Sequence, residues 1–141
     1  MILIFDHFFV DLAFQSLIER KDMIKQVLLV GAGGAVGSIF RFLISEITGR
    51  YYVQSFPLAT FVINVLGCFI IGLLVNMLPA NANLKLILIV GFCGGFTTFS
   101  TFARESMDLI NQQQSFLALL YVVASSVVGI TAVWVGMQIS K

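Results

Sequence analysis

The chain has 141 residues, of which 59% are hydrophobic and 11% are charged, and its formal net charge is +1. Soluble domains carry about 25% charged residues, so most of this surface must face something other than water. The near-neutral charge gives no sign of a nucleic-acid or acidic partner. The two cysteines lie inside apolar runs without CxxC spacing, which argues against a disulfide framework.

Residues 1–22 mix large apolar side chains with charged ones and differ from the rest of the chain. Their spacing is compatible with an amphipathic helix that lies on the membrane surface. The alternative is that translation starts at Met23, where MIKQVLLVG would open a first membrane span. The only histidine, His7, falls in this segment, and we interpret it as a surface residue and not as a ligand.

Four apolar segments reach the length of about 20 residues that a membrane-spanning helix needs. The Lys and Arg residues divide almost evenly between the two ends of these segments, so a single topology and insertion in both directions both remain open. The sequence therefore predicts an all-α membrane protein with one four-helix domain, residues 23–141, and with both termini on the same side. The predicted spans are residues 26–47, 57–78, 84–103 and 116–139.

Small residues recur at the spacing that lets membrane helices approach closely. Gly33 with Gly37, and Gly91 with Gly95, each form a GxxxG pair. Four closely packed helices leave no room for a water-filled pore among themselves. Any pathway for a solute is therefore expected between subunits, most simply in a dimer with two-fold symmetry.

Polar side chains lie at helical spacing inside the predicted spans, where they are costly and mark interior or functional positions. Thr60 and Asn64 are four residues apart in the second span, and Tyr121 and Ser125 are four apart in the fourth. Each side chain could hydrogen-bond within the bundle, bond back to its own helix, or donate to an anion. These alternatives remain open on the sequence alone.

Charged residues are almost absent from the predicted spans. Arg41 lies well inside the first span, where it could snorkel to the interface, pair with Glu46, or draw an anion toward a vestibule. Glu105 and Asp108 fall in the expected loop after the third span. Proton-coupled cation transporters need a carboxylate within the membrane, so its expected absence favours a small anion as the solute.

The third span contains the stretch GFCGGFTTFSTF, residues 91–102. A glycine inside a helix costs about 1 kcal/mol relative to alanine, so we expect the helix to break at residues 91–95. The freed carbonyl oxygens would suit a cation such as Na⁺, and two copies on a two-fold axis could complete its cage. Phe99 and Phe102 then share one helix face, where positive ring edges can favour an anion; plain packing is the alternative.

Three segments resemble, in this order and spacing, the CrcB/Fluc family of fluoride channels: GGAVGSIFRF (33–42), PLATFVINVLGCFIIG (57–72) and GFCGGFTTFSTF (91–102). The resemblance covers about Met23 to Lys141, and its third motif is highly specific. It implies an antiparallel, dual-topology homodimer with a broken third helix in each subunit and two fluoride pores. It also implies passive, selective export of F⁻ through the cell inner membrane, which reduces fluoride toxicity, and a structural Na⁺ at the dimer interface.

The resemblance also assigns roles to individual residues. The sequence departs from the family pattern at Gly129, where family members can carry Ser, and its residues 1–22 have no counterpart in the family. The implied pore residues are Asn64, Phe99, Phe102, Ser100, Thr101, Thr60, Tyr121 and Ser125, the implied vestibule residue is Arg41, and the implied Na⁺ ligands are the backbone carbonyls of Gly94 and Thr97.

Two other functions remain open on the residues alone. A small ion-coupled secondary transporter of a small anion would show saturation and dependence on the gradient of the coupling ion. An assembly or scaffold protein would give the glycines packing roles only. An enzyme is disfavoured, because no nucleophile, base and orienting group occur together.

Overall fold

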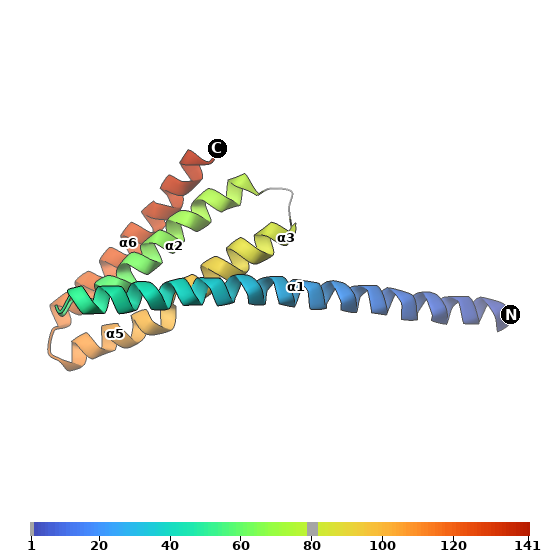
Figure 1. Cartoon of the computed structure of the whole chain (residues 1–141), viewed down its shortest axis with the longest axis horizontal. Coiled ribbons are helices and arrows are strands. Elements are labelled where there is room, and N and C mark those ends of the chain that lie inside the picture. Colours follow the sequence, from blue (N-terminus) through green and yellow to red (C-terminus); the bar gives the residue numbers. More distant parts are fainter. Residues whose placement is uncertain (1, 79–81) are drawn as a thin grey trace.

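The protein is described by a computed structural model that covers residues 2–78 and 82–141, with side chains described from residue 20 onward. Every regular element in these ranges is helical. Three long helices are unbroken: α1 (Ile2–Tyr51), α2 (Leu58–Met77) and α6 (Ser115–Ile139) (Figure 1). With the third helical segment, Ala82–Asn111, four segments are long and apolar enough to cross a membrane, which confirms the prediction of an all-α protein with four membrane-length helical segments.

The third segment is broken, but not where the sequence predicts. The chain remains helical through residues 91–95, and the break falls at Thr97 and Thr98, whose backbones are extended (φ −78°, ψ 159° and φ −149°, ψ 115°). The expectation of a break at the glycines is therefore wrong by a few residues. The pieces are α3 (Ala82–Leu84), the π-helix η1 (Lys85–Cys93), α4 (Gly94–Phe96) and α5 (Phe99–Asn111).

The glycines of the third segment serve close packing against α1. A Cβ added to Gly91 would lie 2.7 Å from the carbonyl oxygen of Val30, and a Cβ added to Gly95 would collide with the carbonyl oxygen of Gly34. The two backbones thus cross in direct contact, as the GxxxG pattern predicts. Because this packing compensates the low helix propensity of glycine, the segment stays helical there.

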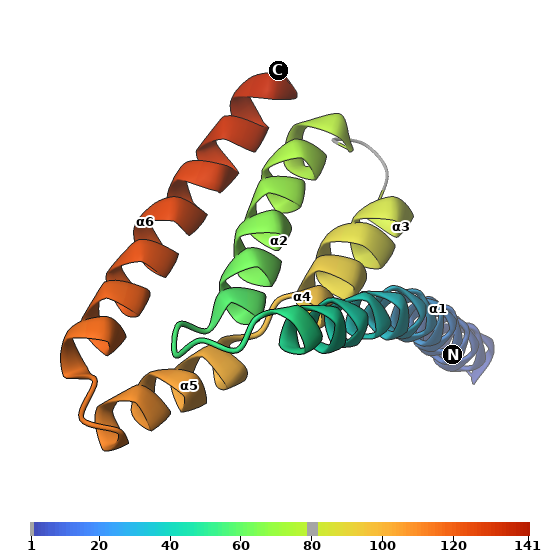
Figure 2. The same ribbon diagram turned by 60° about the vertical axis from the view of Figure 1, so that its left-hand side comes forward.

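A second pair of helices packs through glycines on the other side of the bundle. A Cβ on Gly72 of α2 would collide with the carbonyl oxygen of Val133 in α6. Near the end of this pair, Asn76 Nδ2 donates to the carbonyl oxygen of Met137 at 2.9 Å. Figure 2 shows α6 and α2 side by side, with α5 crossing below them.

The helix α5 extends beyond the end of the predicted third span. Residues 104–114 were expected to form a loop, but α5 continues to Asn111. The i,i+4 ion pair between Arg104 Nη1 and Asp108 Oδ2, at 2.9 Å, supports the added turn. This extension brings Glu105 into the helical bundle, which changes the interpretation of the site below.

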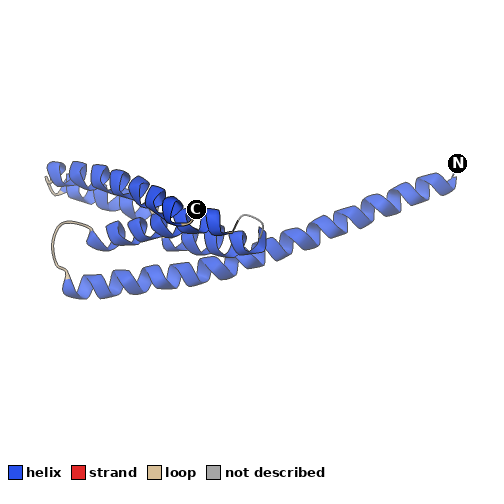
Figure 3. Ribbon diagram, turned by 90° about the horizontal axis from the view of Figure 1, so that it is seen from above, coloured by secondary structure: helices blue, strands red, loops and turns tan. Residues whose placement is uncertain are grey.

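The long helices expose large apolar side chains, as membrane-spanning helices do. Phe42 on α1 is 62% exposed and Phe116 on α6 is 80% exposed. The N-terminal part of α1 projects past the other helices (Figure 3). Its side chains before residue 20 lie outside the described ones, so the surface helix at residues 1–22 and the start at Met23 both remain predictions.

The contact between α1 and the third segment gives a first testable expectation. Gly37→Ala would drive a Cβ into the carbonyl oxygen of Phe92, and overpacking of this kind destabilises by about 1–3 kcal/mol. Gly49→Ala is the matched control, because a Cβ there meets nothing within 4 Å. We expect the midpoint of thermal unfolding in detergent to fall for Gly37→Ala and to hold or rise for Gly49→Ala. Equal midpoints for the two variants would contradict the close crossing.

Candidate functional site

The break in the third segment is held by one side chain of α2. Asn64 Nδ2 donates to the carbonyl oxygen of Thr98 at 3.2 Å, and the amide of Thr98 donates to Asn64 Oδ1 at 2.8 Å. An amide side chain offers both a donor and an acceptor, so it can replace the two backbone partners that an extended residue loses within a helix. Asn64 therefore satisfies the backbone of Thr98, a residue that is buried in the bundle.

This pairing releases backbone carbonyls on either side of the break. In a continuous helix the Thr98 amide would donate to the Gly94 carbonyl oxygen, but here it donates to Asn64. In the same way the Thr101 amide donates to Thr98 Oγ1 at 3.2 Å and not to the carbonyl of Thr97. Two carbonyl oxygens thus lose their usual helical donors, and Gly94 is exposed on the single chain.

Thr98 caps the restarted helix and gathers the neighbouring hydroxyls. Its Oγ1 donates to Thr101 Oγ1 at 3.0 Å and lies 3.4 Å from Ser100 Oγ. A threonine at the N-cap is favoured because its oxygen accepts from an otherwise unpaired amide. Ser100 and Thr101 are therefore brought together beside the break, whereas Thr97 Oγ1 bonds back to the Cys93 carbonyl at 2.9 Å.

Aromatic rings continue from the break toward the opposite end of α5. The rings of Phe99 and Phe102 lie with centroids 5.8 Å apart, and Phe102 lies 5.0 Å from Tyr121. Phe56, in the connection between α1 and α2, meets Tyr121 edge to face at 5.4 Å. Phe99 is 79% exposed on the single chain. The shared face of Phe99 and Phe102 is confirmed, and Phe56 is a member of the row that the sequence did not reveal.

A carboxylate sits where the sequence predicted none. Thr60 Oγ1 donates to Glu105 Oε1 at 2.9 Å, and Tyr121 OH donates to Glu105 Oε2 at 2.9 Å. Tyr121 is fully buried. The expectation that Glu105 lies in a loop is therefore wrong, because α5 runs on past residue 103. Glu105 meets Thr60 in the first turn of α2, near the end of the bundle, so the absence of an acidic residue deep in a span stays a prediction. Thr60 and Asn64 share a face of α2, yet they hold different partners.

The polar residues of α6 behave differently from one another. Ser126 Oγ and Thr131 Oγ1 bond back to carbonyls of their own helix at 2.8 Å. Ser125 Oγ is buried and has no hydrogen-bond partner among the described residues. A buried hydroxyl without a partner costs about 1–3 kcal/mol and calls for an explanation. Ser125 lies one turn after Tyr121, so the free hydroxyl continues the polar line beyond Glu105.

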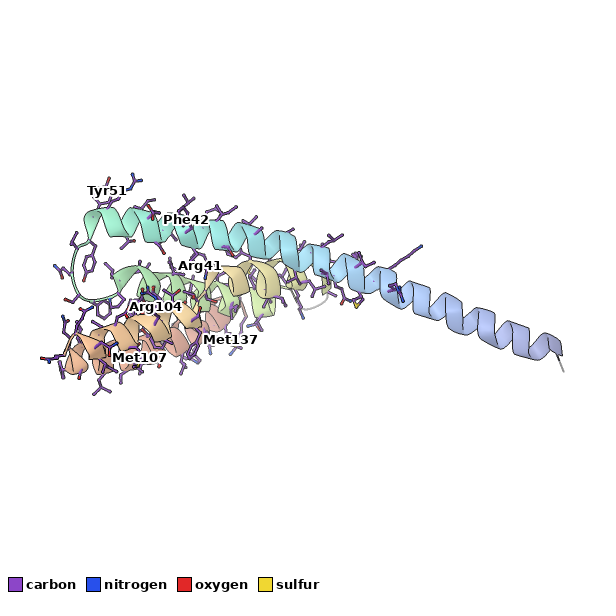
Figure 4. The ribbon with its side chains drawn as sticks, turned by 90° about the horizontal axis from the view of Figure 1, so that it is seen from below. Arg41, Phe42, Tyr51, Arg104, Met107 and Met137 are labelled. Carbon is purple, nitrogen blue, oxygen red and sulfur yellow. The ribbon has the colours of Figure 1, made fainter. Side chains whose placement is uncertain are left out.

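Arg41 lies on α1 and is half-exposed. Within the described part of the chain it makes no salt bridge with Glu46 or another carboxylate (Figure 4).

A pocket of about 320 Å³ opens beside the break and joins the Asn64 side of the break to α6. It is lined by Asn64, Cys68, Ile71, Thr97, Thr98, Phe99 and Val133.

Comparison with known proteins identifies the family. The model of the family described as CrcB-like protein, Camphor Resistance (CrcB), matches residues 28–137. The chain is 42% identical over 118 residues to the fluoride-specific ion channel FluC of Azobacteroides pseudotrichonymphae genomovar. CFP2, a match that covers 81% of this chain and 94% of that protein. It is 46% identical over 117 residues to the fluoride-specific ion channel FluC 2 of Rhodococcus jostii (82% and 98%). The resemblance drawn from the motifs is confirmed.

The Asn64–Thr98 pairing gives a second testable expectation. Asn64→Ala removes two hydrogen bonds and leaves the backbone of Thr98 unpaired, which should cost about 1–3 kcal/mol for each buried group. Asn76→Ala, which loses the single bond to Met137, is the matched control. We expect the larger fall in the unfolding midpoint for Asn64→Ala, together with faster amide exchange at Thr98. A smaller effect than that of Asn76→Ala would contradict the role of Asn64.

Proposed function

The chain belongs to the CrcB-like family, and from this premise we propose that it is a fluoride-selective channel that lets F⁻ leave the cytoplasm passively. Relatives that it matches over more than four-fifths of its length are named fluoride-specific ion channels. With its four membrane-length helices it is a multi-pass membrane protein and a channel, not an enzyme. The observation that carries the proposal is the break at Thr98, which sets aromatic rings and hydroxyls side by side within a span.

The pathway residues suit a small anion that must shed water. Ring edges of Phe99 and Phe102 carry partial positive charge and attract an anion weakly. The hydroxyls of Ser100 and Thr101 supply donors beside them, and the unpartnered Ser125 Oγ can donate further along. Weak, repeated donors favour conduction, because an ion must leave each site as easily as it enters. Arg41, half-exposed on α1, would raise the local anion concentration.

Glu105 occupies a place on this pathway that an anion could use. Its two oxygens accept from Thr60 and Tyr121, and Thr60 lies in the first turn of α2, where the helix dipole attracts negative charge. The carboxylate thus keeps both hydroxyls oriented toward one point. A passing F⁻ would share these donors with Glu105 or take them over.

The carboxylate also supports a second candidate function, an ion-coupled transporter of a small anion. A titratable group inside the bundle is what proton coupling requires, and Glu105 is such a group. The two functions differ in energetics. Passive flux follows the F⁻ gradient alone, whereas coupled flux depends on a second gradient. Persistence of F⁻ efflux when the pH is equal on both sides and no sodium gradient is present would exclude the coupled transporter.

The proposal includes an antiparallel homodimer. Phe99, Ser100 and Gly94 are exposed on the single chain. The hydroxyl of Ser100 and the backbone carbonyl of Gly94 would be costly to expose to lipid. A second copy related by a two-fold axis would cover them and complete a pathway. The nearly even distribution of Lys and Arg supports insertion in both directions. Mass measurement of the detergent-solubilised complex tests this, and a monomeric mass would contradict it.

The proposal also includes Na⁺ at the dimer interface. The Gly94 and Thr97 carbonyls have lost their helical donors, and free carbonyl oxygens are the hard ligands that such a cation prefers. The residues therefore fit the group. Two copies would bring four such oxygens to the axis. The ion would tie the two broken helices together and supply no reactive chemistry.

Selectivity and pathway are tested by ion efflux from liposomes. We expect F⁻ efflux with little Cl⁻ efflux, read with ion-selective electrodes. Phe102→Ile removes a ring from the row and should slow F⁻ efflux by about tenfold or more, which corresponds to roughly 1.4 kcal/mol in the barrier. Phe116→Ile is the matched control, because Phe116 points outward from α6 and is 80% exposed. Equal F⁻ and Cl⁻ efflux, or normal efflux in Phe102→Ile, would count against the proposal.

The sodium site is tested by stability. A ligand that binds only the folded state stabilises it by mass action, so the unfolding midpoint should rise with NaCl and not with an equal ionic strength of N-methylglucamine chloride. In Asn64→Ala the Thr98 amide is free to bond the Gly94 carbonyl and compete with Na⁺, so the shift should shrink. The same midpoint in both salts for the unmutated protein would rule out the site.

A further inference from the structure

A second, polar pocket lies at the end of the bundle where α1 meets α2. It measures about 310 Å³, room for roughly ten water molecules. The pocket opens between the α1–α2 connection and α5. The residues that line it are Gln54, Ser55, Phe56, Pro57, Glu105, Asp108, Leu109 and Gln112.

Two of these residues also belong to the row of rings and hydroxyls. Glu105 faces the pocket and accepts hydrogen bonds from Thr60 and Tyr121. Phe56 lines the pocket and meets the ring of Tyr121 edge to face at 5.4 Å. The pocket therefore borders the polar cluster of Glu105, Thr60 and Tyr121. A hydrated anion in the pocket would lie next to Glu105, a member of that cluster.

The charge of the pocket poses a difficulty for an anion. Glu105 and Asp108 both line it, and two carboxylates would repel F⁻. Glu105 is engaged by two hydroxyls, and Asp108 is paired with Arg104, whose Nη1 lies 2.9 Å from Asp108 Oδ2. Arg104 lies on α5, one turn before Asp108 (Figure 4). The arginine thus offsets the charge of Asp108, and the formal charge left at the pocket is that of Glu105, whose oxygens accept from two hydroxyls.

We propose that this pocket is the aqueous mouth of the anion pathway and that the Arg104–Asp108 ion pair sets the electrostatic potential there. The inference rests on the proposed fluoride channel function and adds to it an entrance and the residues that control it. Because the side chains of the pair are 68% and 46% exposed, the pair contributes little to stability. Its substitution should leave the fold intact and change the rate of ion entry.

The electrostatic potential at the pocket is tested by substitutions that change its charge, measured at low and at high ionic strength. Arg104→Gln leaves Asp108 unpaired and should lower F⁻ efflux roughly threefold at an ionic strength of about 0.01 M, with recovery at about 0.3 M where the charges are screened. Asp108→Asn should raise efflux under the same low-salt conditions. The double variant should lie near the unmutated protein. Lys141→Gln makes the same change in net charge at the far end of α6, where Lys141 contacts Gln138, and should have no effect.

Steric occlusion tests the mouth independently of charge. Gln112→Cys and Asn111→Cys are labelled in detergent with a bulky neutral maleimide and then reconstituted, with the treated parent protein as the reference for Cys68 and Cys93. Gln112 lines the pocket, and Asn111, the preceding residue, does not. We expect label at position 112 to reduce F⁻ efflux several-fold and label at position 111 to leave it unchanged.

The outcomes separate this inference from the function on which it rests. Normal F⁻ efflux from the unmutated protein, with no effect of the pocket substitutions or of label at position 112, would overturn the mouth alone. Effects that persist unchanged at high ionic strength would overturn the electrostatic role of the ion pair. No F⁻ efflux from the unmutated protein would overturn the channel and the mouth together.

Discussion

The hydrogen bonds between Asn64 and the backbone of Thr98 are the constraint on which the rest of the site depends. They pair the backbone amide and carbonyl of Thr98, an extended residue within a membrane-length helical segment, where an unpaired backbone group is too costly to persist. Because Thr98 stays extended, its hydroxyl can cap α5 and the Gly94 carbonyl loses its helical donor. The direction of α5 then places Phe102 and Glu105 against Tyr121 of α6, with the ring of Phe99 beside that of Phe102. One amide side chain thus connects the proposed cation ligands to the proposed anion pathway.

The glycines provide the second constraint, and they act on the opposite side of the same segment. Gly91 and Gly95 let the third segment lie directly on the backbone of α1, so its position is fixed before the break begins. α2 and α6 form a separate close pair through Gly72 of α2 and Gly136 of α6. The break lies between these two closely packed pairs. This arrangement explains why an irregular backbone is tolerated there, and why its exposed side is available to a second copy in the proposed dimer.

Much of this architecture can be predicted from the sequence, because span length, apolar composition and GxxxG spacing are local properties. The position of the break could not be predicted, since glycine propensity argues for residues 91–95 while contacts with α1 keep that part helical. Thr98 could have been found as the N-cap of the restarted helix from the TTFSTF pattern. Glu105 was placed in a loop because residues 104–111 are polar enough to end a span, and only the partners Thr60 and Tyr121 explain its position. Because Glu105 is a carboxylate within the helical bundle, the proposal of a passive channel rests on the family and on the geometry of the break.

The most direct measurement is fluoride efflux from liposomes that contain Asn64→Ala at a matched protein density, with the fold verified by elution as a single species. If Asn64 holds open the break that builds the pathway, F⁻ efflux should fall to the level of protein-free liposomes while the unmutated protein empties its vesicles. Efflux from Asn64→Ala at the rate of the unmutated protein would contradict the account, because a helix free to close at Thr98 would then conduct as well as one that is held open.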